Sequence, residues 1–222
     1  TPERFTNVLR SRNVFGLVIG PLDFPGTLPI EWDRFPMATM GATLREPRLH
    51  RAATHFSHAI PLAWTKLREM GYRKIGVLFS QDANRRVDFA LEAGCAVLKS
   101  SRGVRGLPVM RRENLTVGEF RQWVDKHQLD ALITGFSSRM ASWISELGWR
   151  IPGDMGLVSL MSGPRHSPGA LIVRDFKTIG SATVDLVLGQ IWRNERGVPQ
   201  VPKTVMIEGD WDPGGLAPGQ TP

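Results

Sequence analysis

Three histidines stand close together in the chain, and their type and spacing are the first signs of possible chemistry. They are His50, His55 and His58. Imidazole nitrogens bind zinc and related metals, and His55 and His58, three residues apart, can share one face of a helix. No cysteine or carboxylate stands in register with them in the sequence. A partly exposed helix start is therefore favoured over a metal site.

Other reactive residue types show no catalytic arrangement. The acid pairs Asp23 with Glu31 and Asp210 with Asp212 lie in predicted turns and in the C-terminal tail, where solvated structural roles are expected. The single cysteine, Cys95, lies in an Ala/Leu-rich helical stretch and is predicted to be a small buried apolar residue. The chain has no G-x-G-x-x-G, P-loop or G-x-S-x-G motif. The sequence thus predicts no enzyme, no cofactor and no metal.

The charge balance is basic but dispersed. The 222 residues carry a net charge of +7, and 41% are hydrophobic, which is enough to bury a core. The tightest basic group spans a glycine-containing loop and consists of Arg102, Arg105, Arg111 and Arg112. Solvated loops are favoured over a nucleic-acid face made by this chain alone. Neither a signal peptide nor a membrane span is evident, so a cytoplasmic location and no membrane partner are predicted.

The elements that would position these residues alternate between strand and helix. The turn Pro152-Gly153-Asp154 stops one helix directly before the apolar run 155–160, as expected at a helix-to-strand corner of a parallel sheet. Thr116 and Glu119 have capping-box spacing at the start of another helix. Strands are predicted at 14–20, 35–41, 73–79, 106–110, 130–136, 155–160, 169–176 and 203–211, and helices at 3–13, 56–71, 85–100, 116–127, 137–148 and 177–194. This alternation indicates doubly wound α/β sheets.

Four stretches together resemble one family. They are VFGLVIG; LREMGYRKIGVLF with RRVDF after it; DALITGFSSRMASWISELGWRIPGDMGLVSL; and FKTIGSATVDLVLGQIWRN with its following strand. They are similar to the effector-binding core of LacI-type (lactose repressor family) transcriptional regulators, which itself resembles the periplasmic sugar-binding proteins. The resemblance extends from about Arg10 to about Trp211.

The resemblance implies an α/β fold of two doubly wound parallel-sheet subdomains around a cleft, of the periplasmic-binding-protein-like type I. The N-terminal subdomain is expected to take 1–50 and 174–198, and the C-terminal subdomain 51–173 and 199–222. The family's first strand and helix are not matched, so the N-terminal subdomain is expected to be incomplete. The DNA-binding helix-turn-helix is also unmatched, so operator DNA is expected to be bound by a segment outside this chain.

The resemblance also implies residues that bind an effector. Arg85 stands where the family places an arginine that grips sugar hydroxyls or carboxylates in a bidentate way, with Arg86 as a close alternative. An exposed arginine at a helix N-terminus is the simpler interpretation of Arg85. Arg174 occupies a position where a polar ligand contact is common. Phe176 matches an aromatic residue that lines the cleft near the hinge, and its alternative role is plain core.

Several effector positions depart from the family pattern. The family's Asn-Asp becomes Ser137-Ser138, whose alternative role is to cap a helix that starts at Arg139. Two acidic positions become Met161 and Gly41. Sugar binders orient hydroxyls with carboxylate and amide acceptors, and these have been lost while arginine donors remain. The pattern favours an anionic or less polar effector, or none, over a neutral sugar.

The function that the resemblance implies is a ligand-responsive transcriptional regulator. Effector binding would change subdomain closure, and a homodimer is expected because operators have two half-sites. Its partners would be a small-molecule effector, either a sugar or an anionic metabolite, and operator DNA. A solute-binding protein of a transport system has the same fold and is the alternative.

Overall fold

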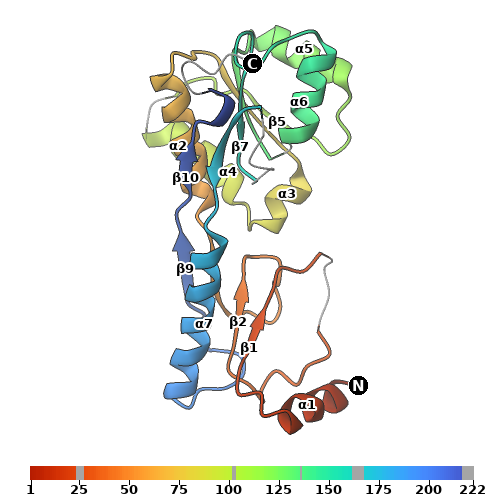
Figure 1. Cartoon of the computed structure of the whole chain (residues 1–222), viewed down its shortest axis with the longest axis vertical. Helices are drawn as coiled ribbons and strands as arrows, with labels where there is room; N and C mark the ends of the chain where they lie inside the picture. The colour runs from red at the N-terminus through yellow and green to blue at the C-terminus, as the bar shows by residue number, and fades with distance from the viewer. Residues whose placement is uncertain (24–27, 102–103, 136, 162–167, 217–222) are drawn as a thin grey trace. The chain divides into compact units, whose positions relative to one another are not determined.

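The computed structural model describes residues 1–23, 28–101, 104–135, 137–161 and 168–216, and these form two compact units (Figure 1). Unit 1 comprises Thr1–Thr54 and Asp175–Ile207, and unit 2 comprises His55–Arg174 and Glu208–Pro222. The ranges predicted from the sequence differ at three places, one of which is Arg174, which belongs to unit 2. Residues 51–54 and 199–207 belong to unit 1 because they contain strands that pair with one another there.

Unit 1 is built on a four-stranded parallel sheet with the order β1-β2-β3-β9. Its strands are β1 (Leu17–Ile19), β2 (Met37–Met40), β3 (His50–Thr54) and β9 (Thr204–Ile207), and its helices are α1 (Pro2–Ser11) and α7 (Phe176–Trp192). Helix α7 packs on β2 and β3. Leu9 of α1 packs against an apolar cluster of unit 1 that includes Ile19, Phe35 and Met37.

Two features hold α7 close to the sheet of unit 1. The buried Gln190 side chain donates to the Met37 carbonyl at 2.9 Å and accepts from the Met37 amide at 3.2 Å. Gly16 leaves room for Val187, because a Cβ at this glycine would lie 2.5 Å from Val187 Cγ1. These contacts fix the helix in position against β2.

Unit 2 is built on a six-stranded sheet with the order β10-β8-β7-β6-β4-β5, in which only the edge pair β10–β8 is antiparallel. Its strands are β4 (Ile75–Phe79), β5 (Val109–Arg111), β6 (Ala131–Thr134), β7 (Gly156–Ser159), β8 (Ala170–Val173) and β10 (Asp210–Asp212). Its helices are α2 (Phe56–Glu69), α3 (Gln81–Arg86), α4 (Ala90–Ser101), α5 (Val117–His127), α6 (Ser137–Glu146) and the short 3₁₀ helix η1 (Gly214–Leu216).

Helices cover both faces of the sheet in unit 2 (Figure 1). Successive side chains of a strand point to opposite faces of the sheet. Val77 and Phe79 of β4 join the cluster formed with α2 and α4, whereas Leu78 joins the cluster formed with α5 and α6. Cys95 of α4 is buried as predicted, and burial raises the pKa of its thiol to about 11.

Two local sequence signals are found as predicted. In the capping box of α5, the Thr116 amide donates to Glu119 Oε2 at 3.0 Å and the Glu119 amide donates to Thr116 Oγ1 at 3.3 Å. In the turn before β7, Asp154 Oδ2 accepts from the Arg150 amide at 2.8 Å and from its Nε at 3.1 Å. These bonds from Arg150 hold the pKa of Asp154 below its ordinary value.

The structure differs from the predicted elements at three places. Strand β3 was not predicted at all. The single helix predicted at 85–100 is divided into α3 and α4, because Asp88 and Phe89 have positive φ angles of 55° and 60°. The strand predicted at 203–211 is two strands, β9 and β10, that belong to different sheets.

The predicted α/β class with two parallel sheets is confirmed. None of the helices in the described ranges is both long and apolar enough to cross a bilayer.

Candidate functional site

The strand order of unit 2 marks one edge of its sheet as a candidate binding site. The chain passes from β4 outward to β5 and then returns to the other side of β4 to form β6, so the order reverses between β4 and β6. In open α/β sheets, ligands bind at such a switch point, beyond the carboxyl ends of the strands. The pairing of Leu78 with Thr134, and of Thr134 with Ser159, aligns the ends of β4, β6 and β7. We call this the carboxyl edge of unit 2.

Arg85 lies at this edge on α3, the helix that directly follows β4. Ser80 caps that helix, because its Oγ accepts from the Ala83 amide at 2.9 Å. Arg85 is in the last turn, and its side chain is 53% exposed with a guanidinium nitrogen 3.8 Å from Asp82 Oδ1. The alternative interpretation of Arg85 was a solvated arginine at the N-terminus of a helix. The side chain is largely exposed, but it lies at the C-terminal end of α3, so the alternative is wrong about the helix end. Arg86 is half-buried beside it.

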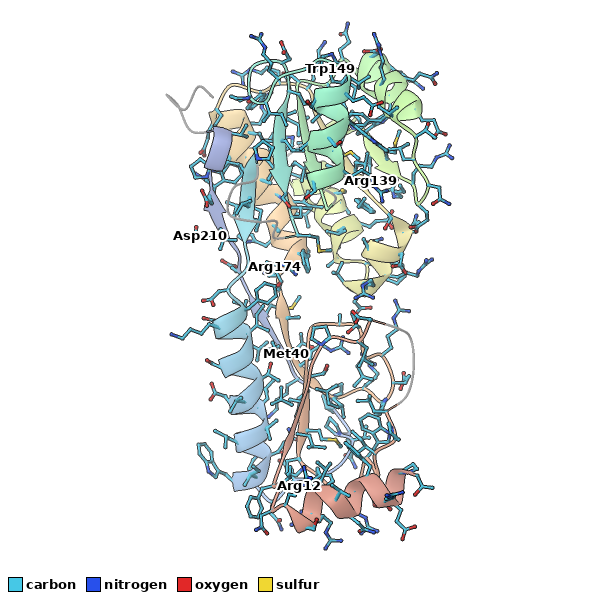
Figure 2. The ribbon with its side chains drawn as sticks, turned by 45° about the vertical axis from the view of Figure 1, so that its right-hand side comes forward. Arg12, Met40, Arg139, Trp149, Arg174 and Asp210 are labelled. Atoms are coloured by element: carbon cyan, nitrogen blue, oxygen red, sulfur yellow. The ribbon has the colours of Figure 1, made fainter. Side chains whose placement is uncertain are left out.

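The two serines that replace the family's Asn-Asp begin helix α6. The helix starts at Ser137, as the predicted range 137–148 has it. The alternative, in which the serines cap a helix that starts at Arg139, is wrong, because Ser138 belongs to the first turn. Ser138 is exposed, whereas the side chain of Ser137 lies outside the described residues. Figure 2 shows Arg139 on the first turn of α6.

Met161 follows β7 and forms an apolar part of the carboxyl edge. It is half-buried against the core, and its carbonyl accepts from Ser159 Oγ at 2.7 Å. A Cβ at Gly135 would lie 3.4 Å from Met161 Cγ, so this side chain adjoins the connection between β6 and α6. Its thioether sulfur is only a weak hydrogen-bond acceptor, so the Met161 side chain does not replace a carboxylate as a partner for a ligand hydroxyl.

Arg174 directly follows β8 at the same edge and is the last residue of this segment of unit 2 (Figure 2). Its side chain is half-buried, with Cζ 6.0 Å from the centroid of the Phe56 ring. Burial lowers the pKa of this guanidinium, which nevertheless remains a cation at neutral pH because arginine titrates so far above it. A cation held over an aromatic face is oriented as well as charged.

Gly41 and Phe176, two further predicted site residues, belong to unit 1. Gly41 follows β2 with a φ of +77°, and its amide donates to the Ala52 carbonyl at 2.8 Å. Phe176 is the first residue of α7 and is 51% exposed. The alternative that Phe176 is a core residue is therefore wrong.

Sequence reasoning missed Arg111 as a residue of the carboxyl edge. It ends β5 opposite Phe79, with Cζ 5.8 Å from the centroid of that ring, and a guanidinium nitrogen lies 2.8 Å from Glu92 Oε1. Its Nε is buried and has no hydrogen-bond partner among the described residues. The sequence places Arg111 in a dispersed basic group, and only the pairing of β4 with β5 brings it to this edge.

The buried Asn84 was also missed. It is fully buried, and its Oδ1 accepts from the Glu92 amide at 3.2 Å, which fixes α3 to the start of α4. Asn84 thus positions the helix that carries Arg85. The same bond places Glu92, the partner of Arg111, so both arginines depend on it.

The histidines do not form the single group that their spacing suggested. His50 lies in β3, where it is buried and its Nδ1 accepts from the Lys203 amide at 2.8 Å. Burial lowers the pKa of His50. His55 and His58 do stand at a partly exposed helix start, as predicted, but His50 does not.

Comparison with known proteins finds no matching family model and no matching curated sequence. Solved structures do match. A cellobiose complex of the transcriptional regulator CelR is 18% identical with a TM-score of 0.69, over 95% of this chain and 68% of that one. A ribose-bound LacI family regulator from Enterococcus faecium is 15% identical with a TM-score of 0.63, over 95% and 82%. The fold is that of the LacI-family regulator core.

A LacI-family regulatory protein from Chloroflexus aggregans matches equally well, at 16% identity and a TM-score of 0.69 over 96% of this chain and 80% of that one. Identity this low shows a shared LacI-type fold and leaves the function of this chain to be argued from its site.

Proposed function

We propose that this chain is the effector-binding and dimerisation core of a LacI-type transcriptional regulator, non-enzymatic and cytoplasmic. The observation that supports this most directly is the arginine-bearing carboxyl edge of unit 2, at the switch point of a LacI-type fold. Operator DNA would be bound by a helix-turn-helix outside these residues. The effector would act through a difference in its affinity for two states of the regulator, since binding both equally shifts nothing.

The effector proposed for this site is a sugar-like metabolite that carries a negative charge. Arg85, Arg111 and Arg174 supply charged donors at one edge of the sheet, and such donors suit carboxylates and phosphates. Met161 supplies only a weakly accepting thioether where the family has an acidic residue. A neutral sugar would therefore leave hydroxyls without acceptors, whereas an anionic group would find donors.

A ligand panel tests this proposal. We expect ribose 5-phosphate or a comparable sugar acid to bind at least about tenfold more tightly than ribose or cellobiose, because one charge-assisted hydrogen bond contributes about 1.5–3 kcal/mol. At a concentration of 100 times the Kd, the melting temperature should rise by about 5 °C. Calorimetry and thermal melting measure both effects. Equal affinity for charged and neutral sugars would contradict the anionic preference, and no binding across the panel would contradict the effector role.

The homodimer is inferred from the two half-sites of a typical operator and from an exposed apolar stripe in unit 1. The stripe runs along α7 and consists of Val184, Leu188, Ile191 and Trp192, the last of them 81% exposed. These positions follow helical spacing, so they form one continuous face. A second copy of the chain is the partner that we propose for it.

Charge on this stripe should weaken self-association. We expect Trp192→Glu to raise the dimer dissociation constant at least about tenfold, because large exposed aromatic residues often dominate interface energies. Sedimentation velocity over a concentration series measures this. Val97→Glu on α4, also an exposed apolar residue, is the matched control and should leave the constant unchanged. A monomeric wild-type chain, or a Trp192→Glu variant that dimerises normally, would contradict the inference.

A further inference from the structure

We propose that His55, His58 and Glu208 form a binding site for Zn²⁺ or a closely similar transition-metal ion. All three residues belong to unit 2. The Nδ1 atoms of His55 and His58 lie 3.8 Å and 3.9 Å from the same carboxylate oxygen, Oε1 of Glu208. One ligand atom from each residue lies within 4.8 Å of the others. The site is separate from the proposed effector role and does not depend on it.

The register of two parallel strands explains why these distant residues meet. Thr54, the last residue of β3, is paired with Ile207, the last residue of β9. His55 and Glu208 are the next residues in each segment, so the chain leaves the paired strands with these two side by side. His58 lies three residues further along, in the first turn of α2, where it can share a face with His55.

The imidazoles of this cluster make no hydrogen bond that would compete with a metal ion among the described residues. His55 is the N-cap residue of α2, yet its side chain makes no capping hydrogen bond. His58 Nδ1 is buried and has no hydrogen-bond partner among the described residues. The two rings are stacked, with centroids 5.6 Å apart. A buried nitrogen without a partner is costly unless something binds it, and a metal ion would do so.

The chemistry of these ligands selects the ion. Two imidazoles and one carboxylate form a ligand set that Zn²⁺ takes in proteins, with a fourth position left for water. Glu208 is 66% exposed, which leaves that position open to solvent. Ligand atoms around tetrahedral Zn²⁺ are about 3.3 Å apart, so each histidine Nδ1 has to move about half an ångström closer to Glu208 Oε1. All three ligand atoms lie within 4.8 Å of one another, a spread that side-chain rotation can close. Mg²⁺, which prefers oxygen ligands, should not bind.

Calorimetric titration of the whole chain, first stripped with a chelator, tests the site. We expect one Zn²⁺ per chain and no binding of Mg²⁺. His58→Ala and Glu208→Gln should each lower the Zn²⁺ affinity at least about tenfold, since loss of even a supporting residue costs that much. His127→Ala is the matched control, because this histidine lies at the end of α5 and should contribute nothing.

Circular dichroism of each variant establishes that it is folded before titration. Glu208→Gln preserves shape at an exposed position, so it decides the question even if His58→Ala disturbs the start of α2. Wild-type chain that binds no Zn²⁺ would show the cluster to be an ion pair only. Wild-type affinity retained in Glu208→Gln would place the zinc elsewhere. Either result overturns the proposal.

Discussion

Replacing Phe79 by alanine should lower the free energy of unfolding of unit 2 by about 3–5 kcal/mol. Phe79 is the last residue of β4 and is completely buried in the cluster formed with α2 and α4. Its loss would leave a cavity directly beneath the carboxyl edge, where its ring also contacts the Arg111 guanidinium. Urea denaturation followed by circular dichroism measures the change.

Phe89→Ala is the matched control for this substitution. Phe89 lies between α3 and α4 in the same unit and is 48% exposed, so its truncation should cost about 1 kcal/mol or less. If the two variants lost equal stability, burial of the Phe79 ring would not be what stabilises this edge.

Replacing Arg85 by alanine should weaken effector binding by about 100-fold while leaving the fold intact. A bidentate, charge-assisted contact contributes about 3 kcal/mol, which corresponds to that factor. The side chain is 53% exposed, so little packing is lost with it. Calorimetry with the tightest ligand of the sugar panel measures the affinity, and thermal melting verifies the fold.

Arg121→Ala provides the comparison for Arg85→Ala. Arg121 on α5 is 61% exposed and forms a similar surface ion pair, with its Nε 3.6 Å from Asp125 Oδ2. Its removal should leave the affinity unchanged, because it lies outside the carboxyl edge. An Arg85→Ala variant that binds as tightly as the wild type would remove this arginine from the site.

Much of the fold could be predicted because strong local signals coincide with the elements. The Thr116–Glu119 capping box and the turn at Asp154 act through residues close in sequence, so they are visible without a structure. Strand β3 could not be predicted, because HRAAT carries neither regular alternation nor a strongly apolar run. Its stability comes from β2 and β9 on either side, and the latter lies about 150 residues away.

The site residues also fall into a group that could be predicted from the sequence and a group that could not. Arg85, Ser138, Met161 and Arg174 follow consecutive strand and helix signals, so their placement at one edge follows from the parallel topology. Arg111 and Glu208 could not be placed, because strand pairing brings Arg111 opposite Phe79 and Glu208 beside His55. Long-range register is the information that the sequence alone did not supply.

The interleaving of the two units also sets an order of assembly during synthesis. The strands β4 to β8 come from one continuous stretch, 75–173, so this sheet can form while the rest of the chain is still being made. The sheet of unit 1 has to wait for β9, which follows β3 by about 150 residues, or about 8–30 s at 5–20 residues per second. During that interval β3 has an open edge and α7 has yet to cover its face, so we expect residues 1–54 to be more open to mispairing than the sheet of unit 2.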